Sequence, residues 1–209
     1  LPSGEQVFSV LDEIYDQGYR KVLAICISGS LSGTCNMLRL ICEDYDKLEC
    51  RVIDSKNISI GSGIIAIRAA QLLEEGLSFE ELCQKTKEML SSSKIFFCLK
   101  TLEYLQKGGR IGKVAAMLGS AISLKPIISC NEEGNYYPMA KALGRAPSVK
   151  KVLELAQKFA EGCPKVMLAV MHGGAAEEAE ALLTEVRKKI PNGIVAVRGQ
   201  ISPALGVHT

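Results

Sequence analysis

Residues 22–34 read Val22-Leu23-Ala24-Ile25-Cys26-Ile27 and then Ser28-Gly29-Ser30-Leu31-Ser32-Gly33-Thr34. The first six are apolar without polar alternation, which is typical of a parallel strand covered on both faces. The next seven are small and mostly polar, and a helical pattern follows them to about Asp44. This order predicts a strand–loop–helix unit of an α/β protein.

Strand and helix patterns continue to alternate through the first part of the chain. The further segments expected there are a helix over 5–17, a strand over 49–54 and helices over 60–75 and 79–90. Ser78 is placed to cap the last of these helices, and Glu81 stands three residues on as its capping-box partner. Residues 1–92 are therefore predicted to form a parallel-sheet, Rossmann-like domain.

The pattern changes after Ser91-Ser92-Ser93. The segments expected next are a strand over 94–100, helices over 102–107 and 114–122, and strands over 125–130 and 135–140. The short connection 131–134 suits an antiparallel hairpin. The remaining segments are a helix over 149–160 capped by Ser148, a strand over 165–171, a helix over 175–189 and a strand over 194–199. Residues 93–209 are therefore predicted to form a second, smaller α/β domain with a mixed sheet.

Composition excludes several classes of protein. The 209 residues are 47% hydrophobic and carry a formal net charge of +2, so the chain can bury a substantial core. Only 5% of residues are aromatic and no basic block stands out, so nucleic-acid binding is not expected. The apolar runs are too short to span a bilayer. At most a transient membrane contact is expected.

The cysteines indicate a reducing compartment, the cytoplasm. No pair has the spacing Cys-x-x-Cys, and only His172 and His208 could join a cysteine ligand set. We therefore expect no metal site, no cofactor and eight free, mostly buried thiols. The eight are Cys26, Cys35, Cys42, Cys50, Cys83, Cys98, Cys130 and Cys163.

The polar loop Ser28–Thr34 is the best local candidate for a binding site. It follows a strand and opens a helix, where α/β proteins bind ligands and where backbone N–H groups attract anions. Its hydroxyls, including those of Ser28, Ser32 and Thr34, can donate to a carboxylate or a phosphate, and Gly33 allows close approach. A plain turn with a helix N-cap is the alternative. The glycine spacing matches neither a Walker loop nor the dinucleotide fingerprint.

Three cations are candidates for binding an anion or a partner protein. Arg110 lies in the glycine-rich run 107–112, and Lys141 and Arg145 follow the predicted hairpin. A helix C-cap followed by a solvated arginine is the alternative interpretation at Arg110. His208 is a further polar candidate near the end of the chain, and no serine has a base and a carboxylate near it in sequence. No catalytic residue is therefore assigned.

Several blocks occur together in an order that resembles the DegV family of bacterial fatty-acid-binding proteins. They are Ile27–Thr34, Val52–Ser55, Thr101–Ile111, Lys125–Ile128 and Gly206–Thr209. The resemblance implies two α/β domains with a long-chain fatty acid between them. It also implies a carrier, and not an enzyme, that presents the acid to a separate fatty-acid kinase.

The resemblance assigns roles residue by residue. Ser32 matches the family's serine in the Leu-Ser-Gly-Thr block, Ser28 matches a neighbouring serine, and His208 matches a histidine of the last block. The family's Lys-x-Arg after the hairpin reads Lys141-Ala142-Leu143 here, with the arginine displaced to Arg145. Relatives extend beyond both ends of this chain, which we expect to be a fragment.

A phosphosugar-binding protein, isomerase-like or a sensor, is the alternative. Such domains also seat phosphate on a serine- and threonine-rich loop after a parallel strand. That alternative gives no role to the blocks at 102–111 and at the C-terminus.

Overall fold

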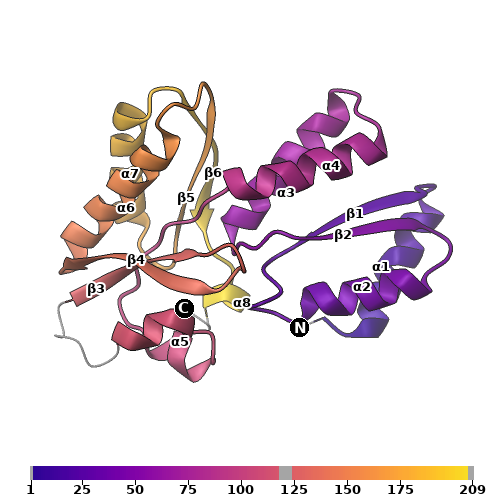
Figure 1. The fold of residues 1–209 in the computed structure, drawn as a ribbon, viewed down its shortest axis with the longest axis horizontal. Coiled ribbons are helices and arrows are strands. Elements are labelled where there is room, and N and C mark those ends of the chain that lie inside the picture. Colours follow the sequence, from indigo (N-terminus) through magenta and orange to yellow (C-terminus); the bar gives the residue numbers. More distant parts are fainter. Residues whose placement is uncertain (1, 118–123, 207–209) are drawn as a thin grey trace. The chain divides into compact units, whose positions relative to one another are not determined.

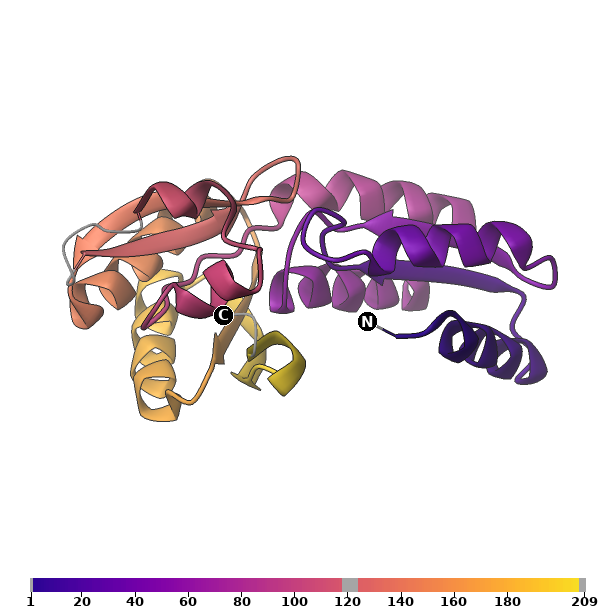
Figure 2. The ribbon, with the colours of Figure 1, turned by 90° about the horizontal axis from the view of Figure 1, so that it is seen from below.

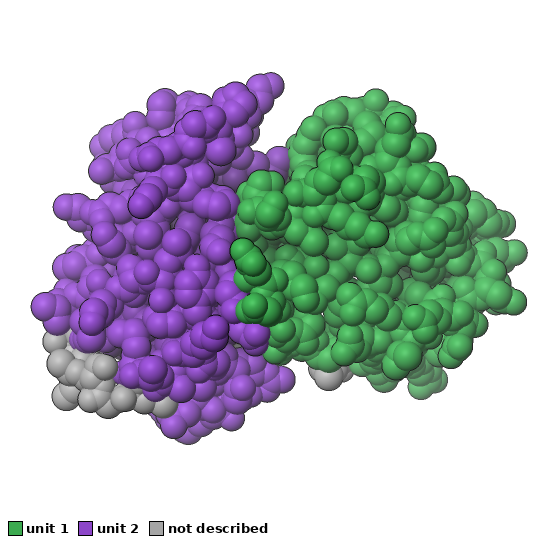
Figure 3. Space-filling view, in the orientation of Figure 1, with its two compact units in different colours: residues 1–93, 132–134 green, residues 94–131, 135–209 purple. Residues whose placement is uncertain are grey.

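The computed structural model describes residues 2–117 and 124–206. The chain divides into two compact units, coloured separately in Figure 3. Unit 1 comprises residues 1–93 and 132–134, and unit 2 comprises residues 94–131 and 135–209. The fold is of the mixed α/β class that the sequence predicts. The domain boundary between residues 92 and 93 stays a prediction.

Unit 1 alternates helices and strands around one parallel strand pair. Its elements are α1 (Gly4–Asp16), β1 (Lys21–Cys26), α2 (Thr34–Asp44), β2 (Glu49–Asp54), α3 (Ile60–Glu74), α4 (Phe79–Met89) and a short 3-10 helix, η1 (Leu90–Ser92). β1 and β2 pair in parallel from Lys21 opposite Glu49 to Cys26 opposite Asp54. Figures 1 and 2 show α1 and α2 on one side of these strands and α3 and α4 on the other.

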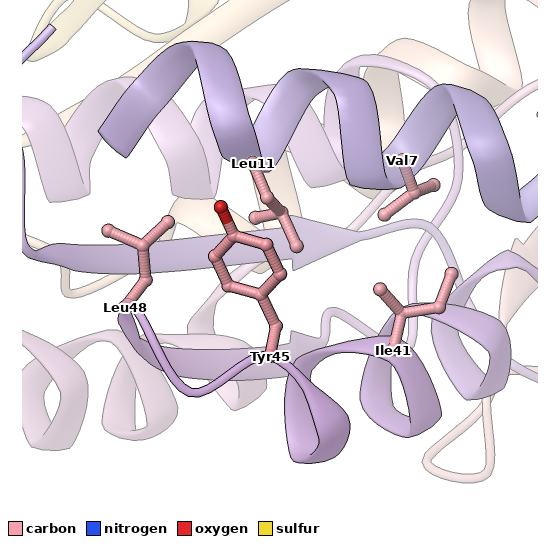
Figure 4. Close-up of a cluster of buried hydrophobic side chains, with 5 residues drawn as sticks. All are labelled: Val7, Leu11, Ile41, Tyr45 and Leu48. Carbon is pink, nitrogen blue, oxygen red and sulfur yellow. The ribbon is translucent and has the colours of Figure 1, made fainter. Parts of the chain in front are cut away.

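Two apolar clusters cover the two faces of β1. The first gathers side chains from α1, α2 and the segment before β2, which point toward one another in Figure 4. Its buried members are Val7, Leu11, Ile41, Tyr45 and Leu48. Val22 packs against this cluster, whereas Leu23 and Ile25 pack against the cluster of α3 and α4. Successive strand residues point to opposite faces, so the continuous apolar run of β1 serves both clusters, as predicted.

Unit 2 combines an antiparallel hairpin with a parallel strand pair. Its elements are α5 (Glu103–Lys107), the 3-10 helix η2 (Gly112–Met117), β3 (Leu124–Cys130), β4 (Tyr136–Leu143), α6 (Arg145–Ala160), β5 (Val166–His172), α7 (Ala176–Lys189), β6 (Gly193–Gln200) and α8 (Pro203–Gly206). β3 and β4 form the predicted hairpin, and β5 and β6 pair in parallel. A core of Leu153, Val170, Leu183 and Val186 joins α6, β5 and α7.

Three expected segments differ from the structure. The strand expected over 94–100 is extended chain that forms a single bridge, in which Phe97 and Ile128 exchange N–H···O bonds of 3.0 and 2.8 Å. The helix expected over 114–122 is η2, and residues 118–123 lie outside the described residues.

The helix expected to begin at residue 149 begins four residues earlier. Ser148 lies inside α6, where its hydroxyl donates to the Gly144 carbonyl at 2.6 Å. Gly144 adopts a φ of 83°, which turns the chain out of β4. Pro147 falls in the first helical turn, where its missing N–H is not needed. Among the described residues, no helix is both long enough and apolar enough to cross a bilayer.

Candidate functional site

The loop Ser28–Thr34 is folded onto the carboxyl ends of β1 and β2. The N–H groups of Leu31 and Ser32 donate to the Ser28 carbonyl at 3.0 and 3.1 Å. The Ser28 N–H donates in turn to the carbonyl of Asn57, beyond the end of β2, at 2.7 Å. The loop therefore has a defined shape at the sheet edge where α/β proteins bind ligands.

Two hydroxyls stand together at the start of α2. Ser32 Oγ and Thr34 Oγ1 are 2.9 Å apart, and the Thr34 N–H donates to Ser32 Oγ at 3.3 Å. Both residues are half-buried, and Gly33, which is exposed, occupies the N-cap position without a side-chain cap. Two hydroxyls that share one hydrogen bond keep a second hydrogen to donate. With the partial positive charge of the helix N-terminus, this pair is suited to an anion.

Ser28 differs from this pair because it is fully buried. Its hydroxyl accepts the Ser30 N–H at 3.1 Å. The structure therefore brings Ser32, Gly33 and Thr34 together near the surface and places Ser28 beneath them. A direct contact between Ser28 and a ligand stays a prediction.

A buried carboxylate, Asp54, borders the loop. Burial alone would raise its pKa, but the backbone N–H of Lys56, the Lys56 ammonium and the Gly29 N–H outweigh burial and hold the pKa of Asp54 below its ordinary value. Lys56 Nζ lies 2.9 Å from Asp54 Oδ2. Asp54 is therefore ionised and paired with Lys56, and it anchors the loop at Gly29.

A buried polar network next to the loop was missed by the sequence analysis. Ser55 Oγ and Ser62 Oγ are 2.8 Å apart, and Asn57 Nδ2 donates to Ser93 Oγ at 3.4 Å. Ser59, at the start of α3, has a φ of 54°, which is strained for a residue with a side chain. The cluster Asp54-Ser55 after a strand was the only available signal, and a turn explains it equally well.

The predicted partner-binding cations occupy different environments in unit 2. Arg110 is exposed just after α5, and Lys141 is exposed on β4, where it forms no ion pair among residues 2–117 and 124–206. Arg145 is engaged within the unit: its guanidinium pairs with Glu178 through two nitrogens and donates to the Cys98 carbonyl at 3.1 Å. A role for Arg145 in partner binding stays a prediction, and the structure gives its side chain intramolecular partners.

The thiols of the described residues form no disulfide. All eight cysteines are free, four of them buried and only Cys163 exposed. Burial raises the pKa of Cys26 and of Cys130 to about 12, so both thiols are protonated at neutral pH. Within residues 2–117 and 124–206, no group of three or more metal-ligating side chains could hold an ion. His208 lies outside the described residues.

Two parallel strand–helix units and an antiparallel hairpin, with a hydroxyl-lined loop at the end of β1, define a mixed α/β protein with one candidate anion site. A family model described as "Uncharacterised protein, DegV family" matches residues 1–209. The chain therefore belongs to the DegV family, as its sequence blocks suggested.

Sequence relatives match the whole chain. A DegV domain-containing protein of Clostridium perfringens is 41% identical over 209 residues, which cover 100% of this chain and 73% of that protein. A DegV domain-containing protein of Clostridium acetobutylicum is 36% identical, and the match covers 100% of this chain and 74% of that protein.

Solved structures match equally fully. A DegV family protein from Thermus thermophilus, described as fatty-acid-binding, superposes with a TM-score of 0.90 at 30% identity, with 100% of this chain and 73% of that chain covered. A protein from Eubacterium ventriosum, described as binding stearic acid, superposes with a TM-score of 0.86 at 28% identity and the same coverage. The four matched proteins are thus longer than this chain, and the two solved structures share its fold.

Proposed function

We propose that this protein binds a long-chain fatty acid through the loop Ser28–Thr34 and presents its carboxylate to a partner fatty-acid kinase. The observation that carries the proposal is the Ser32–Thr34 hydroxyl pair, 2.9 Å apart at the uncapped start of α2. Similarity over the full chain to the fatty-acid-binding proteins of T. thermophilus and E. ventriosum supports the choice of ligand.

The carboxylate of the fatty acid needs hydrogen-bond donors that leave it ionised. The Ser32–Thr34 pair supplies the one hydroxyl hydrogen that its own hydrogen bond leaves free, and the first turn of α2 supplies a partial positive charge. Asp54 borders the loop, but its pairing with Lys56 keeps its charge compensated. An anion at the hydroxyl pair therefore meets favourable dipoles.

A carrier role fits this chemistry better than catalysis. The acyl tail contributes about 0.8 kcal/mol per buried CH2 group, so affinity comes mainly from the tail. The hydroxyls fix the position of the carboxylate, and ATP-dependent phosphorylation belongs to the kinase. In this role the protein acts in the cytoplasm, where ATP is available to the kinase. It contacts a membrane transiently when a fatty acid is exchanged.

Replacing the Ser32 hydroxyl tests the carboxylate site. Ser32→Ala in the full-length protein is expected to weaken palmitate binding about 10- to 100-fold, since a hydrogen bond to a charged group contributes about 1.5–3 kcal/mol. Titration calorimetry measures the affinity. Ser32→Thr keeps the hydroxyl and should retain most of the affinity.

Ser92→Ala is the matched control, because it also removes a serine hydroxyl that forms a hydrogen bond within unit 1, here to the Met89 carbonyl at 3.0 Å. It should bind palmitate as the wild type does. If Ser32→Ala binds as tightly as this control, the carboxylate is not held by the loop. Tighter binding of a phosphosugar than of palmitate would instead favour the alternative ligand class.

A further inference from the structure

A turn from far along the chain rests on the candidate site within unit 1. Residues 132–134 connect β3 to β4, yet they belong to the same compact unit as the loop Ser28–Thr34. The Ser30 hydroxyl donates to the Glu133 carbonyl at 2.7 Å, across 103 residues of sequence. The loop and the turn are therefore joined by a specific hydrogen bond.

Gly134 fits against the loop in a way that only glycine allows. Its φ is +83°, in the left-handed region. A methyl group added there would overlap the Ser28 hydroxyl and would lie 2.9 Å from Ser28 Cβ and 3.3 Å from Lys56 Cα. The turn thus covers Ser28 closely, which agrees with the complete burial of that side chain.

Hydrogen bonds of Ser28 connect the residue that the turn covers to the rest of the loop. Its hydroxyl accepts the Ser30 N–H at 3.1 Å, and its carbonyl accepts the N–H groups of Leu31 and Ser32. Its own N–H is held by Asn57. Every polar group of Ser28 is therefore engaged in setting the path of the backbone that leads to Ser32.

We propose that the turn 132–134 is a positioning element of the carboxylate site, and that Ser28, Ser30 and Gly134 act on the ligand only through the placement of Ser32 and Thr34. This inference rests on the proposed function. A loop fixed before binding loses less conformational freedom when the ligand arrives, so preorganisation increases affinity. Ser28 is then a positioning residue, and this inference replaces the prediction that Ser28 contacts the carboxylate directly.

Two variants with matched controls test the proposal by palmitate affinity of the full-length protein. Ser30→Ala removes the bond to the turn, and Gly134→Ala displaces the turn from Ser28. Each is expected to weaken binding about 3- to 10-fold, the range for loss of one neutral hydrogen bond. Ser30→Thr keeps the hydroxyl and should restore the affinity.

The controls separate positioning from general loss of stability. Ser92→Ala loses a comparable hydroxyl–carbonyl bond elsewhere in unit 1. Gly76→Ala places a side chain at a similar φ of +94°, where no atom lies within 4 Å of the added group. Both controls should bind palmitate as the wild type does. Should Gly134→Ala fail to fold, Ser30→Ala against Ser30→Thr decides.

Hydrogen exchange supplies a readout that a merely structural role would not move. Saturating palmitate should slow amide exchange at both 28–34 and 132–134 in the wild type. In Ser30→Ala, the protection at 132–134 should be lost while part of that at 28–34 remains.

The outcomes distinguish this inference from the proposed function. If Ser32→Ala weakens binding while Ser30→Ala and Gly134→Ala match their controls, the positioning role is wrong and the proposed function stands. If Ser32→Ala also binds normally, the proposed function itself fails.

Discussion

Asp54 is a charged residue that contacts the loop Ser28–Thr34 at Gly29. Its side chain is only 7% exposed, and it accepts hydrogen bonds from the N–H groups of Lys56 and Gly29 in addition to its ion pair with Lys56. A carboxylate with such partners remains ionised at neutral pH and ties the end of β2 to the loop.

Asp54→Asn is expected to lower the free energy of unfolding near neutral pH by about 1.5–3 kcal/mol, because hydrogen bonds to a charged group are lost. The pKa of Asp54 is lowered in the folded protein from 3.8, its ordinary value. The stabilisation is therefore fully present above pH 3.8 and is lost as the pH falls through the folded pKa. In urea unfolding, the difference in free energy of unfolding between the wild type and Asp54→Asn should become smaller below pH 3.8. The same difference at every pH would contradict the stabilising role of the ionised Asp54 carboxylate.

Among the helices, α4 has a beginning that its own sequence defines. Ser78 Oγ accepts the Glu81 N–H at 3.3 Å, and Glu81 Oε2 accepts the Ser78 N–H at 2.9 Å. This is the capping box that the sequence predicts.

Ser78→Ala is expected to lower the free energy of unfolding by about 1 kcal/mol, since the N-cap hydroxyl is lost. Thermal and urea unfolding measure the change. Ser91→Ala is the control, because its exposed hydroxyl makes only a 3.4 Å bond to the Glu88 carbonyl. Equal stability of the two variants would show that the cap contributes nothing.

Elements with a strong local signal could be predicted from the sequence. The apolar run of β1 and the short connection between β3 and β4 both led to the correct pairing. The extended segment around Phe97 has a strand-like composition, but it bridges Ile128 at one residue only, and partners of this kind are not encoded locally. The start of α6 was missed because Ser148 resembles an N-cap, while the turn is made at Gly144.

The same distinction applies to the candidate site. Ser32 and Thr34 lie two residues apart at a strand–helix junction, so their proximity follows from the sequence alone. Glu133 and Gly134 reach the loop across about a hundred residues, and Asn57 contributes a backbone carbonyl that no residue type specifies. Contacts of this second kind depend on the tertiary fold and cannot be predicted from one sequence.

At the scale of the whole molecule, the proposed carrier role separates binding from transfer. Arg110 is exposed, and the planar guanidinium of an arginine can form paired hydrogen bonds to a carboxylate or a phosphate, so it can dock an anionic surface. Arg110→Ala in the full-length protein should leave palmitate affinity unchanged and reduce acyl-phosphate formation when a fatty-acid kinase and ATP are added. Radiolabelled ATP measures the transfer. Loss of palmitate affinity would place Arg110 in the carboxylate site, and acyl phosphate formed without the kinase would contradict the carrier role.

Native mass spectrometry of the full-length protein, purified from cells without added lipid, shows directly whether the protein binds a fatty acid through Ser32. The folded protein is expected to carry one fatty acid of about 14 to 18 carbons, released on denaturation, and Ser32→Ala is expected to carry much less of it. A co-purified phosphosugar, or a fatty acid retained equally by Ser32→Ala, would contradict the proposed function.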